Sequence, residues 1–188
     1  FLQAPAGVAQ PKQLRRLLGH GRFRGNGSTY SRSVFSGPLY TDLASTVGTI
    51  PLAGYYDQKE HVGEGQSGRT VTVTSVLGDY FGVLGVRIAH GRGFLTDEVK
   101  MGTPVPVAVI SDALWHSQFD AAPDVLGKSL MLGVHRFTVV GVAPPGFRGV
   151  GLDGADLWVP LNTDGSWRPK AFHDFDTPYT GFIWPIAR

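Results

Sequence analysis

One stretch decides the fold: Val76-Leu77-Gly78-Asp79-Tyr80-Phe81-Gly82-Val83-Leu84-Gly85-Val86, followed by Gly91-Arg92-Gly93-Phe94. It continues an alternating strand pattern that begins at Val71, passes into a short apolar helix and then into a glycine-punctuated loop. Glycines supply the backbone freedom for such tight turns, and aromatic side chains supply the apolar surface that holds the turns in place. Nothing in the stretch resembles a reaction centre, so we expect a packed structural unit here.

The composition is that of a globular chain. It has 188 residues, of which 42% are hydrophobic and 17% charged, with 26 Gly and 13 Pro, which favours strands and loops over long helices. The net charge of +2 does not indicate nucleic acid as a partner. There is no cysteine, so disulfides and thiolate metal sites are excluded. No apolar segment approaches the roughly 20 residues that span a bilayer, and the start shows no signal-peptide pattern. We expect a soluble chain, compatible with a piece cut from a membrane protein.

The N-terminal part is basic. Residues 11–18 have a helix-compatible composition, and residues 21–33 are rich in Gly, Ser, Asn and Arg, which predicts a mobile loop. The basic side chains, which surround Phe23, are Lys12, Arg15, Arg16, His20, Arg22 and Arg24. A charge run of this kind is most simply a solvated, partly mobile arm. Contact with anionic lipid headgroups is the alternative interpretation.

The next segments predict a helix and a hairpin. Apolar residues at helical spacing predict a helix over 37–46. Alternating apolar residues predict strands over 49–58 and 69–75, joined by a glycine-rich turn at 63–68. An antiparallel pairing of these strands follows from the short connection.

A strand and a helix follow the opening stretch. Residues 77–84 are predicted to form a short helix or turn, which we expect to end at Gly85. Residues 105–110 are apolar and rich in β-branched side chains, which predicts a central strand. Ser111 then suits the N-cap of a helix over 112–119.

The last third predicts a second hairpin and further short strands. Residues 129–132 and 135–142 alternate around Gly133-Val134, a pattern typical of a two-residue turn. One further strand is predicted over 156–161, and an apolar strand begins at 186–188. We expect the chain to stop before the remainder of its domain.

The glycine-rich turn at 63–68 matches the dinucleotide-binding fingerprint letter for letter. That fingerprint requires the glycines to open a helix whose N-terminus meets the pyrophosphate, whereas here a strand follows. A hairpin loop is the better interpretation.

Candidate catalytic and metal-ligating residues are scattered. The six histidines have no metal-ligand spacing: His20, His61, His90, His116, His135 and His173. Asp97 and Glu98 could begin an acidic pair for glycoside chemistry but are expected in a solvated turn, and Asp153 and Asp156 are interpreted as turn residues. No catalytic, cofactor-binding or metal-binding residue is therefore predicted, and the sequence favours a non-enzymatic protein.

Three further features have plain structural interpretations. Ser111 stands between a strand and a helix, as in α/β-hydrolases, but G-x-S-x-G is missing, so helix capping is preferred. Residues 26–28 match a glycosylation sequon by letters only. The large aromatics are expected in the core or at a subdomain boundary, although a ligand groove lined by them is an open alternative: Tyr80, Trp115, Phe119, Phe137 and Trp158.

Six short motifs in order resemble the MacB-like periplasmic core domain of MacB- and FtsX-type ABC transporter permeases. They are Phe81-Gly82-Val83-Leu84-Gly85-Val86, Gly91-Arg92-Gly93-Phe94, Pro106-Val107-Ala108-Val109-Ile110-Ser111 with Trp115 and Phe119, Val125-Leu126-Gly127-Lys128, Phe137-Thr138-Val139-Val140-Gly141-Val142-Ala143-Pro144 and Asp156-Leu157-Trp158-Val159-Pro160-Leu161. Residues 5–11 and 35–43 resemble the start of such domains as well. The resemblance covers nearly all of residues 1–188, which we interpret as one such domain, incomplete at its C-terminus and without its transmembrane helices.

The resemblance implies an α+β fold in two parts, a porter-like βαβ subdomain and a smaller, mainly β subdomain. It implies a periplasmic domain of a bacterial inner-membrane protein that transmits conformational change without catalysis and without a cofactor. Its implied partners are the protein's own transmembrane helices and a cytoplasmic ATP-binding subunit or domain. A periplasmic adaptor, an exported substrate and a second copy of the chain are further candidates. A free-standing periplasmic module that binds a small molecule or peptide is the alternative function.

Overall fold

The computed structural model describes residues 6–22, 28–63, 68–100, 105–161 and 182–188. Its frame is a hairpin of two long strands, β4 (Leu52–Val62) and β5 (Arg69–Gly78), paired antiparallel from Ala53↔Gly78 to Val62↔Arg69. Valine, threonine and tyrosine recur along both strands and suit a pleated, half-buried surface. The predicted hairpin is confirmed, with β4 beginning and ending later than the predicted 49–58. β5 continues past the predicted residue 75 to Gly78, so residues 77 and 78 belong to the strand and not to the short helix or turn predicted over 77–84, because they still pair with β4.

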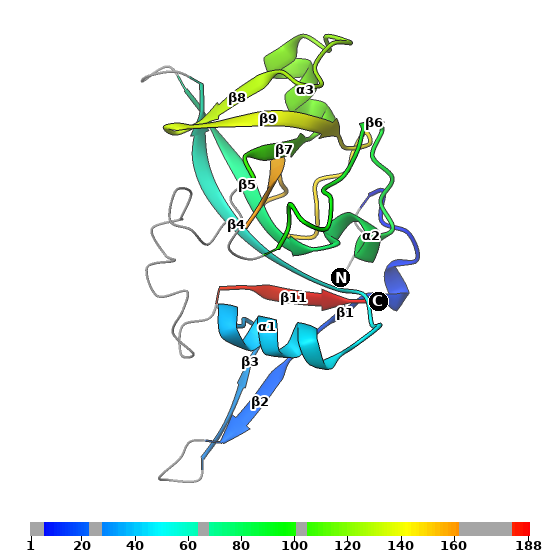
Figure 1. The fold of residues 1–188 in the computed structure, drawn as a ribbon, viewed down its shortest axis with the longest axis vertical. Helices are drawn as coiled ribbons and strands as arrows, with labels where there is room; N and C mark the ends of the chain where they lie inside the picture. The colour runs from blue at the N-terminus through cyan, green and yellow to red at the C-terminus, as the bar shows by residue number, and fades with distance from the viewer. Residues whose placement is uncertain (1–5, 23–27, 64–67, 101–104, 162–181) are drawn as a thin grey trace.

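Within the described ranges, nine strands form one mixed sheet in the order β1-β11-β4-β5-β10-β7-β9-β6, with β8 paired to both β4 and β9 (Figure 1). The other strands are β1 (Arg15–Arg16), β6 (His90–Gly91), β7 (Val107–Ile110), β8 (Ser129–Leu132), β9 (His135–Val142), β10 (Leu157–Pro160) and β11 (Trp184–Ala187). β8 also pairs with β4, at Val62↔Leu132. The strands therefore close into a ring in the order β4-β5-β10-β7-β9-β8, with β8 returning to β4. As predicted, β7 is central, between β10 and β9.

A βαβ unit occupies one end of the sheet. β7 and β9 are parallel, and the crossover between them contains α3 (Asp112–Phe119) and β8. The Ser111 hydroxyl accepts a hydrogen bond of 3.1 Å from the Leu114 N–H, so the predicted helix cap is confirmed. The β8–β9 hairpin is confirmed too, with Gly133 in the left-handed region at φ 57°. The mixed sheet with few helices confirms the α+β class.

Alternate side chains of the central strands fill two separate layers of core. On β5, Val71 and Val73 join the cluster that includes Leu114 of α3, whereas Val76 joins the cluster around the short helix α2 (Tyr80–Leu84). β10 behaves alike, since Leu157 and Val159 lie in the first cluster and Trp158 lies in the second. This period of two places α3 and α2 on opposite faces of the sheet.

A third, smaller core supports the lower part of the molecule in Figure 1. There α1 (Gly37–Thr46) lies beside β11, and Tyr40 of α1 packs with Leu77 and Ile183. The Ser36 hydroxyl caps α1, accepting from the Leu39 N–H, and the helix has the predicted bounds.

Two predictions about the N-terminal part are wrong. Residues 11–18 hold only a 3₁₀ turn, η1 (Pro11–Gln13), followed by β1, because pairing of Arg15 and Arg16 with β11 overrides their helix propensity. In the predicted loop at 21–33, β2 (Gly19–Arg22) pairs with β3 (Thr29–Arg32) as a separate hairpin. The basic residues up to position 22 therefore belong to defined elements and not to a mobile arm.

The β2–β3 hairpin depends on its glycines. A Cβ added at Gly21 would lie 2.4 Å from Cζ of Tyr30, so the tyrosine ring occupies the space that a side chain would fill. Composition suggested a loop because glycine is rare in strand interiors, except where another group approaches the backbone closely.

Candidate functional site

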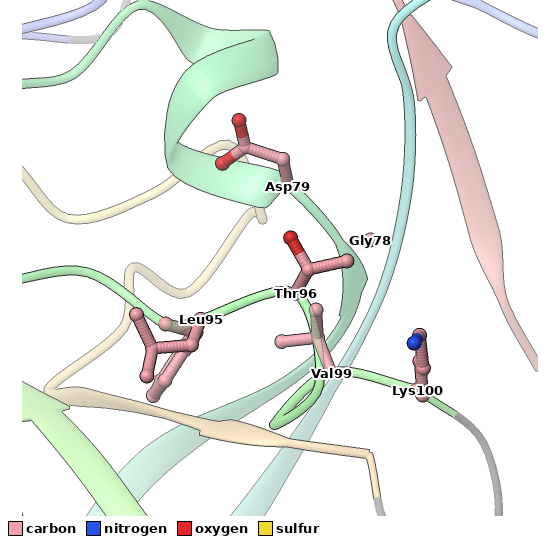
Figure 2. A pocket seen from close by; sticks show the side chains of 7 residues that line it. Gly78, Asp79, Leu95, Thr96, Val99 and Lys100 are labelled. Carbon is pink, nitrogen blue, oxygen red and sulfur yellow. The ribbon is translucent and has the colours of Figure 1, made fainter.

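The main candidate site is a cavity of about 350 Å³ beside the N-terminus of α2. Its lining comes from the β5–α2 junction and from the loop after Arg92: Gly78, Asp79, Phe94, Leu95, Thr96, Val99 and Lys100. Figure 2 shows Asp79 at the start of α2, with Leu95 and Thr96 contributed by the loop. The cavity combines an apolar wall with one carboxylate, one hydroxyl and one ammonium group, so it suits a small amphiphilic ligand better than a reaction.

An ion pair fixes the loop that forms the outer wall. Arg92 and Glu98 make two parallel hydrogen bonds, Nη1 to Oε2 and Nη2 to Oε1, each 2.7 Å long. Glu98 Oε2 also accepts from the Leu95 N–H at 2.8 Å. The hydrogen bond from Arg92 is the main reason that the pKa of Glu98 lies below its usual value.

The interpretation of Asp97 and Glu98 as one solvated turn is therefore wrong for Glu98, which is buried. Asp97 remains exposed and pairs with Lys100 at 2.6 Å, which lowers the pKa of Asp97. The two carboxylates have separate basic partners, and each partner favours the ionised form. They do not form the acid and base pair that glycoside chemistry requires.

The opposite end of α2 forms a second feature, which we call the terminal clamp: Ala9, Val83, Leu84, Gly85 and Arg188. The Ala9 N–H donates to the Leu84 carbonyl at 3.1 Å, and Arg188 Nε donates to the Val83 carbonyl at 2.7 Å. Arg188 Nη2 also donates to the Ala9 carbonyl. The clamp thus joins residue 9, residue 188 and the end of α2.

The terminal clamp requires glycine at position 85. Gly85 lies in the left-handed region at φ 65° and ends α2 as predicted, its N–H bonding back to Gly82 and Phe81. A Cβ at this position would lie 2.7 Å from Cβ of Ala9. Gly85 therefore permits both the turn and the close approach of the N-terminal segment.

Aromatic rings connect α2 to the sheet behind it. Phe81 of α2 packs edge-on against Trp158 of β10 with a centroid distance of 5.6 Å, and Phe147 stacks on Trp158 at 5.1 Å. Tyr80, Phe137 and Trp158 are buried, as predicted for core aromatics. Trp115 and Phe119 are only partly buried at the margin of the α3 layer.

The acidic residues near residue 150 are structural. Asp156 accepts from the Thr72 N–H at 2.9 Å and lies 3.3 Å from Arg148, so it fixes the start of β10 against β5 and is more than a turn residue. Asp153 pairs with Lys59 at 3.5 Å.

Asp57 is a further polar residue that the sequence pattern does not single out; its carboxylate accepts a hydrogen bond of 2.6 Å from the Thr74 hydroxyl. Burial raises the pKa of Asp57, and the hydrogen bond from Thr74 opposes this shift. Asp57 occupies a strand position where the alternation alone gives no sign of a half-buried acid.

The histidines are dispersed. His20 bonds Ser31, His90 packs against Trp115, and His116 lies near Asp112 of its own helix. Within the described ranges, no three His, Cys, Asp or Glu side chains are placed to hold a metal ion. His173 and the first two residues of the sequon at 26–28 lie outside the described residues, as does most of the glycine-rich turn between β4 and β5.

Among the helices that the structure describes, none is long and apolar enough to cross a membrane.

Solved structures share this architecture. The extracellular domain of the noncanonic ABC-type transporter YknZ from Gram-positive bacteria aligns with a TM-score of 0.59 at 14% identity, over 94% of this chain and 83% of that one. The periplasmic region of MacB from Actinobacillus actinomycetemcomitans aligns with a TM-score of 0.61 at 16% identity, over 99% of this chain and 77% of that one. The fold is therefore that of extracytoplasmic domains of ABC-type transporters.

The family model for the MacB-like periplasmic core domain matches residues 7–180, and the chain belongs to this family. The macrolide export ATP-binding/permease proteins MacB of Chromobacterium violaceum and Hahella chejuensis are similar at 28% identity over 95 residues and 30% over 94 residues. These matches cover 49% and 50% of this chain but 14% of each relative. The family is one of transporter domains and not of catalysts, and it places the chain outside the cytoplasm.

Proposed function

We propose that residues 1–188 form a non-catalytic domain of a MacB/FtsX-type ABC permease that transmits conformational change and contacts exported substrate or a periplasmic partner. The terminal clamp carries this proposal. Residues 9 and 188 are far apart in the sequence, yet both bond to the last turn of α2. A force applied to either segment therefore acts on the same short helix.

α2 is suited to pass such a displacement onward. Its C-terminal end lies in the clamp, and its N-cap residue Asp79 lines the cavity beside the loop held by Arg92 and Glu98. Phe81 packs on Trp158, so the helix cannot move independently of the sheet. Coupling of this kind needs rigid, packed elements, which a close-packed aromatic layer supplies.

The partners follow from the same proposal. The protein's own transmembrane helices would apply the displacement, driven by ATP hydrolysis in a cytoplasmic ATP-binding subunit or domain. An exported substrate or a periplasmic adaptor would be contacted on the extracytoplasmic side, and a second copy of the chain would complete a symmetric transporter.

The test uses the full-length permease together with its ATP-binding partner. Replacing Arg188 by methionine keeps an unbranched side chain but removes the donors to Ala9 and Val83. We expect ATP hydrolysis to continue while export falls. Arg136→Gln removes the same charge from an exposed position on β9 and should leave export unchanged. Export that is unaffected by Arg188→Met in a folded protein would overturn the proposal.

The cavity favours a second candidate, a periplasmic module that binds a small molecule or peptide. Its volume of about 350 Å³ lies within the range of small-ligand sites. A thermal-shift screen of amphiphilic ligands on the wild-type chain and on Thr96→Trp, which fills the cavity, tests this function. A ligand that raises the melting temperature of the wild type but not of the variant supports it. A screen without any shift counts against it.

A further inference from the structure

The charges of this chain are strongly segregated along the sequence. Residues 1–41 contain six Lys and Arg and no Asp or Glu, so the other 11 of the 17 basic side chains share residues 42–188 with all 15 acidic ones. The first part therefore carries +6 and the rest −4, although the whole chain is only +2. Such separation creates a local field that the net charge conceals.

The fold gathers part of this charge on a projecting element. The β2–β3 hairpin extends away from the body of the molecule, at the end opposite α3 (Figure 1). His20, Arg22, Thr29 and Ser31 are exposed, whereas Gly21 and Tyr30 alternate with them and are half-buried. A shallow groove of about 480 Å³ runs along these same residues. The exposed face thus presents cationic and hydroxyl groups together.

Arg15 of β1 and Arg22 of the hairpin have no acidic partner among the residues that the structure describes. Arg15 bonds only the carbonyl groups of Lys12 and Leu14 among the described residues. Within the described ranges, neither Arg15 nor Arg22 forms an ion pair with an acidic side chain. Their charge is therefore available to an external anion.

An apolar side chain stands among these cations. Leu18, in the connection between β1 and β2, is 59% exposed. Exposed leucine beside arginine is the combination that interfacial membrane-binding segments use, with the apolar group entering the boundary and the cations meeting the headgroups.

The size of the hairpin argues against a protein partner. The two described strands of four residues, at ~3.3 Å per residue and ~4.8 Å between strands, offer about 130 Å² of sheet area. A stable protein interface needs about 800 Å² from each partner. An anionic membrane needs no such shape match, because its field acts over roughly the Debye length.

We propose that the β2–β3 hairpin, with Arg15 of β1 and Leu18 in the connection that leads into it, binds the surface of a membrane rich in anionic phospholipid. The inference rests on the proposed function only in placing the chain next to a membrane. Binding would fix the orientation of the domain on the bilayer, so that displacements reaching the terminal clamp are not lost in free rotation.

The test is co-sedimentation of the 188-residue chain with vesicles at low ionic strength. We expect binding to vesicles of equal parts phosphatidylglycerol and phosphatidylcholine, little binding to phosphatidylcholine alone, and release as salt is added. Each arginine near an anionic surface raises the membrane affinity about fivefold. The double variant Arg15→Gln/Arg22→Gln should therefore lower the partition coefficient between vesicles and water roughly 20-fold or more. Circular dichroism would verify that this variant is folded.

The matched controls are Arg136→Gln/Arg69→Gln, which removes two exposed charges outside residues 1–41, and Leu18→Ser, which should weaken binding without changing the charge. Equal losses for the two double arginine variants would overturn the proposal, as would equal binding to both kinds of vesicle. Binding to polyglutamate without binding to anionic vesicles would assign the hairpin to an acidic protein and overturn it too. Because no transport is measured, failure here would not bear on coupling through the clamp.

Discussion

Replacing Gly85 by alanine tests the terminal clamp through stability. Alanine at φ 65° lies in the left-handed region, which lowers the free energy of unfolding by roughly 1–2 kcal/mol. Alanine also makes the unfolded chain less flexible than glycine does, which offsets about 0.4–1 kcal/mol of this loss. The new Cβ would also lie 2.7 Å from Cβ of Ala9, well inside the separation of non-bonded carbons. Overpacking of this kind costs about 1–3 kcal/mol. We expect the free energy of unfolding to fall by about 3 kcal/mol in total.

Gly48→Ala is the matched control, because Gly48 has nearly the same φ, 61°, and no heavy atom within 4 Å of an added Cβ. Gly48→Ala should lower the free energy of unfolding by about 1 kcal/mol, because it carries the cost of the left-handed backbone without any steric overlap. The difference of about 2 kcal/mol between the two variants measures the contact with Ala9.

Urea denaturation followed by tryptophan fluorescence gives both values, and Gly85→Ala should melt roughly 6–12 °C lower than the wild type. Adding Ala9→Gly removes the obstructing Cβ and should restore most of the difference between Gly85→Ala and Gly48→Ala. Equal losses at the two glycines, or no recovery with Ala9→Gly, would refute the close approach on which the clamp depends.

Three further substitutions test other parts of the structure. Glu98→Gln should lower the free energy of unfolding by about 2 kcal/mol at neutral pH, through loss of the charged hydrogen bonds from Arg92. Since folding lowers the pKa of Glu98 from its ordinary 4.5, its contribution is present above that value and lost as pH falls through the folded pKa. Urea titrations at neutral and acidic pH should therefore show wild type and variant converging in acid, and a constant gap would contradict this. Tyr80→Phe should change the free energy of unfolding by no more than about 1 kcal/mol, because the buried hydroxyl has the Val150 backbone and the Trp158 ring nitrogen near it but makes no well-aligned hydrogen bond with any described atom. A larger loss in the melting scan would argue against this. Ser111→Ala should lower the free energy of unfolding by about 1 kcal/mol in urea denaturation, the typical contribution of a helix N-cap. Ser111→Asp should keep most of the wild-type stability, because aspartate can also cap a helix. An equal loss of stability with aspartate and with alanine would rule out capping.

The hydrophobic pattern was sufficient for the central elements. Residues 107–110 are all buried and residues 112–119 are helical behind a serine cap, because strand and cap signals are local and agree with the tertiary environment. The order of short motifs was likewise enough to identify the family. No candidate catalytic residue was predicted, and the acidic pair that was weighed is divided between two basic partners.

The N-terminal part and the candidate sites required the tertiary structure. The β2–β3 hairpin could not be predicted from the sequence. Its glycine at position 21 leaves space for the Tyr30 ring, whereas a glycine-rich composition by itself indicates a loop. β1 forms only because β11, from the other end of the chain, offers it a partner. The terminal clamp and the burial of Glu98 arise in the same way from contacts between segments. Elements with local signals could be predicted from the order of the residues. Elements with distant partners could not, because backbone pairing and burial are properties of the assembled chain.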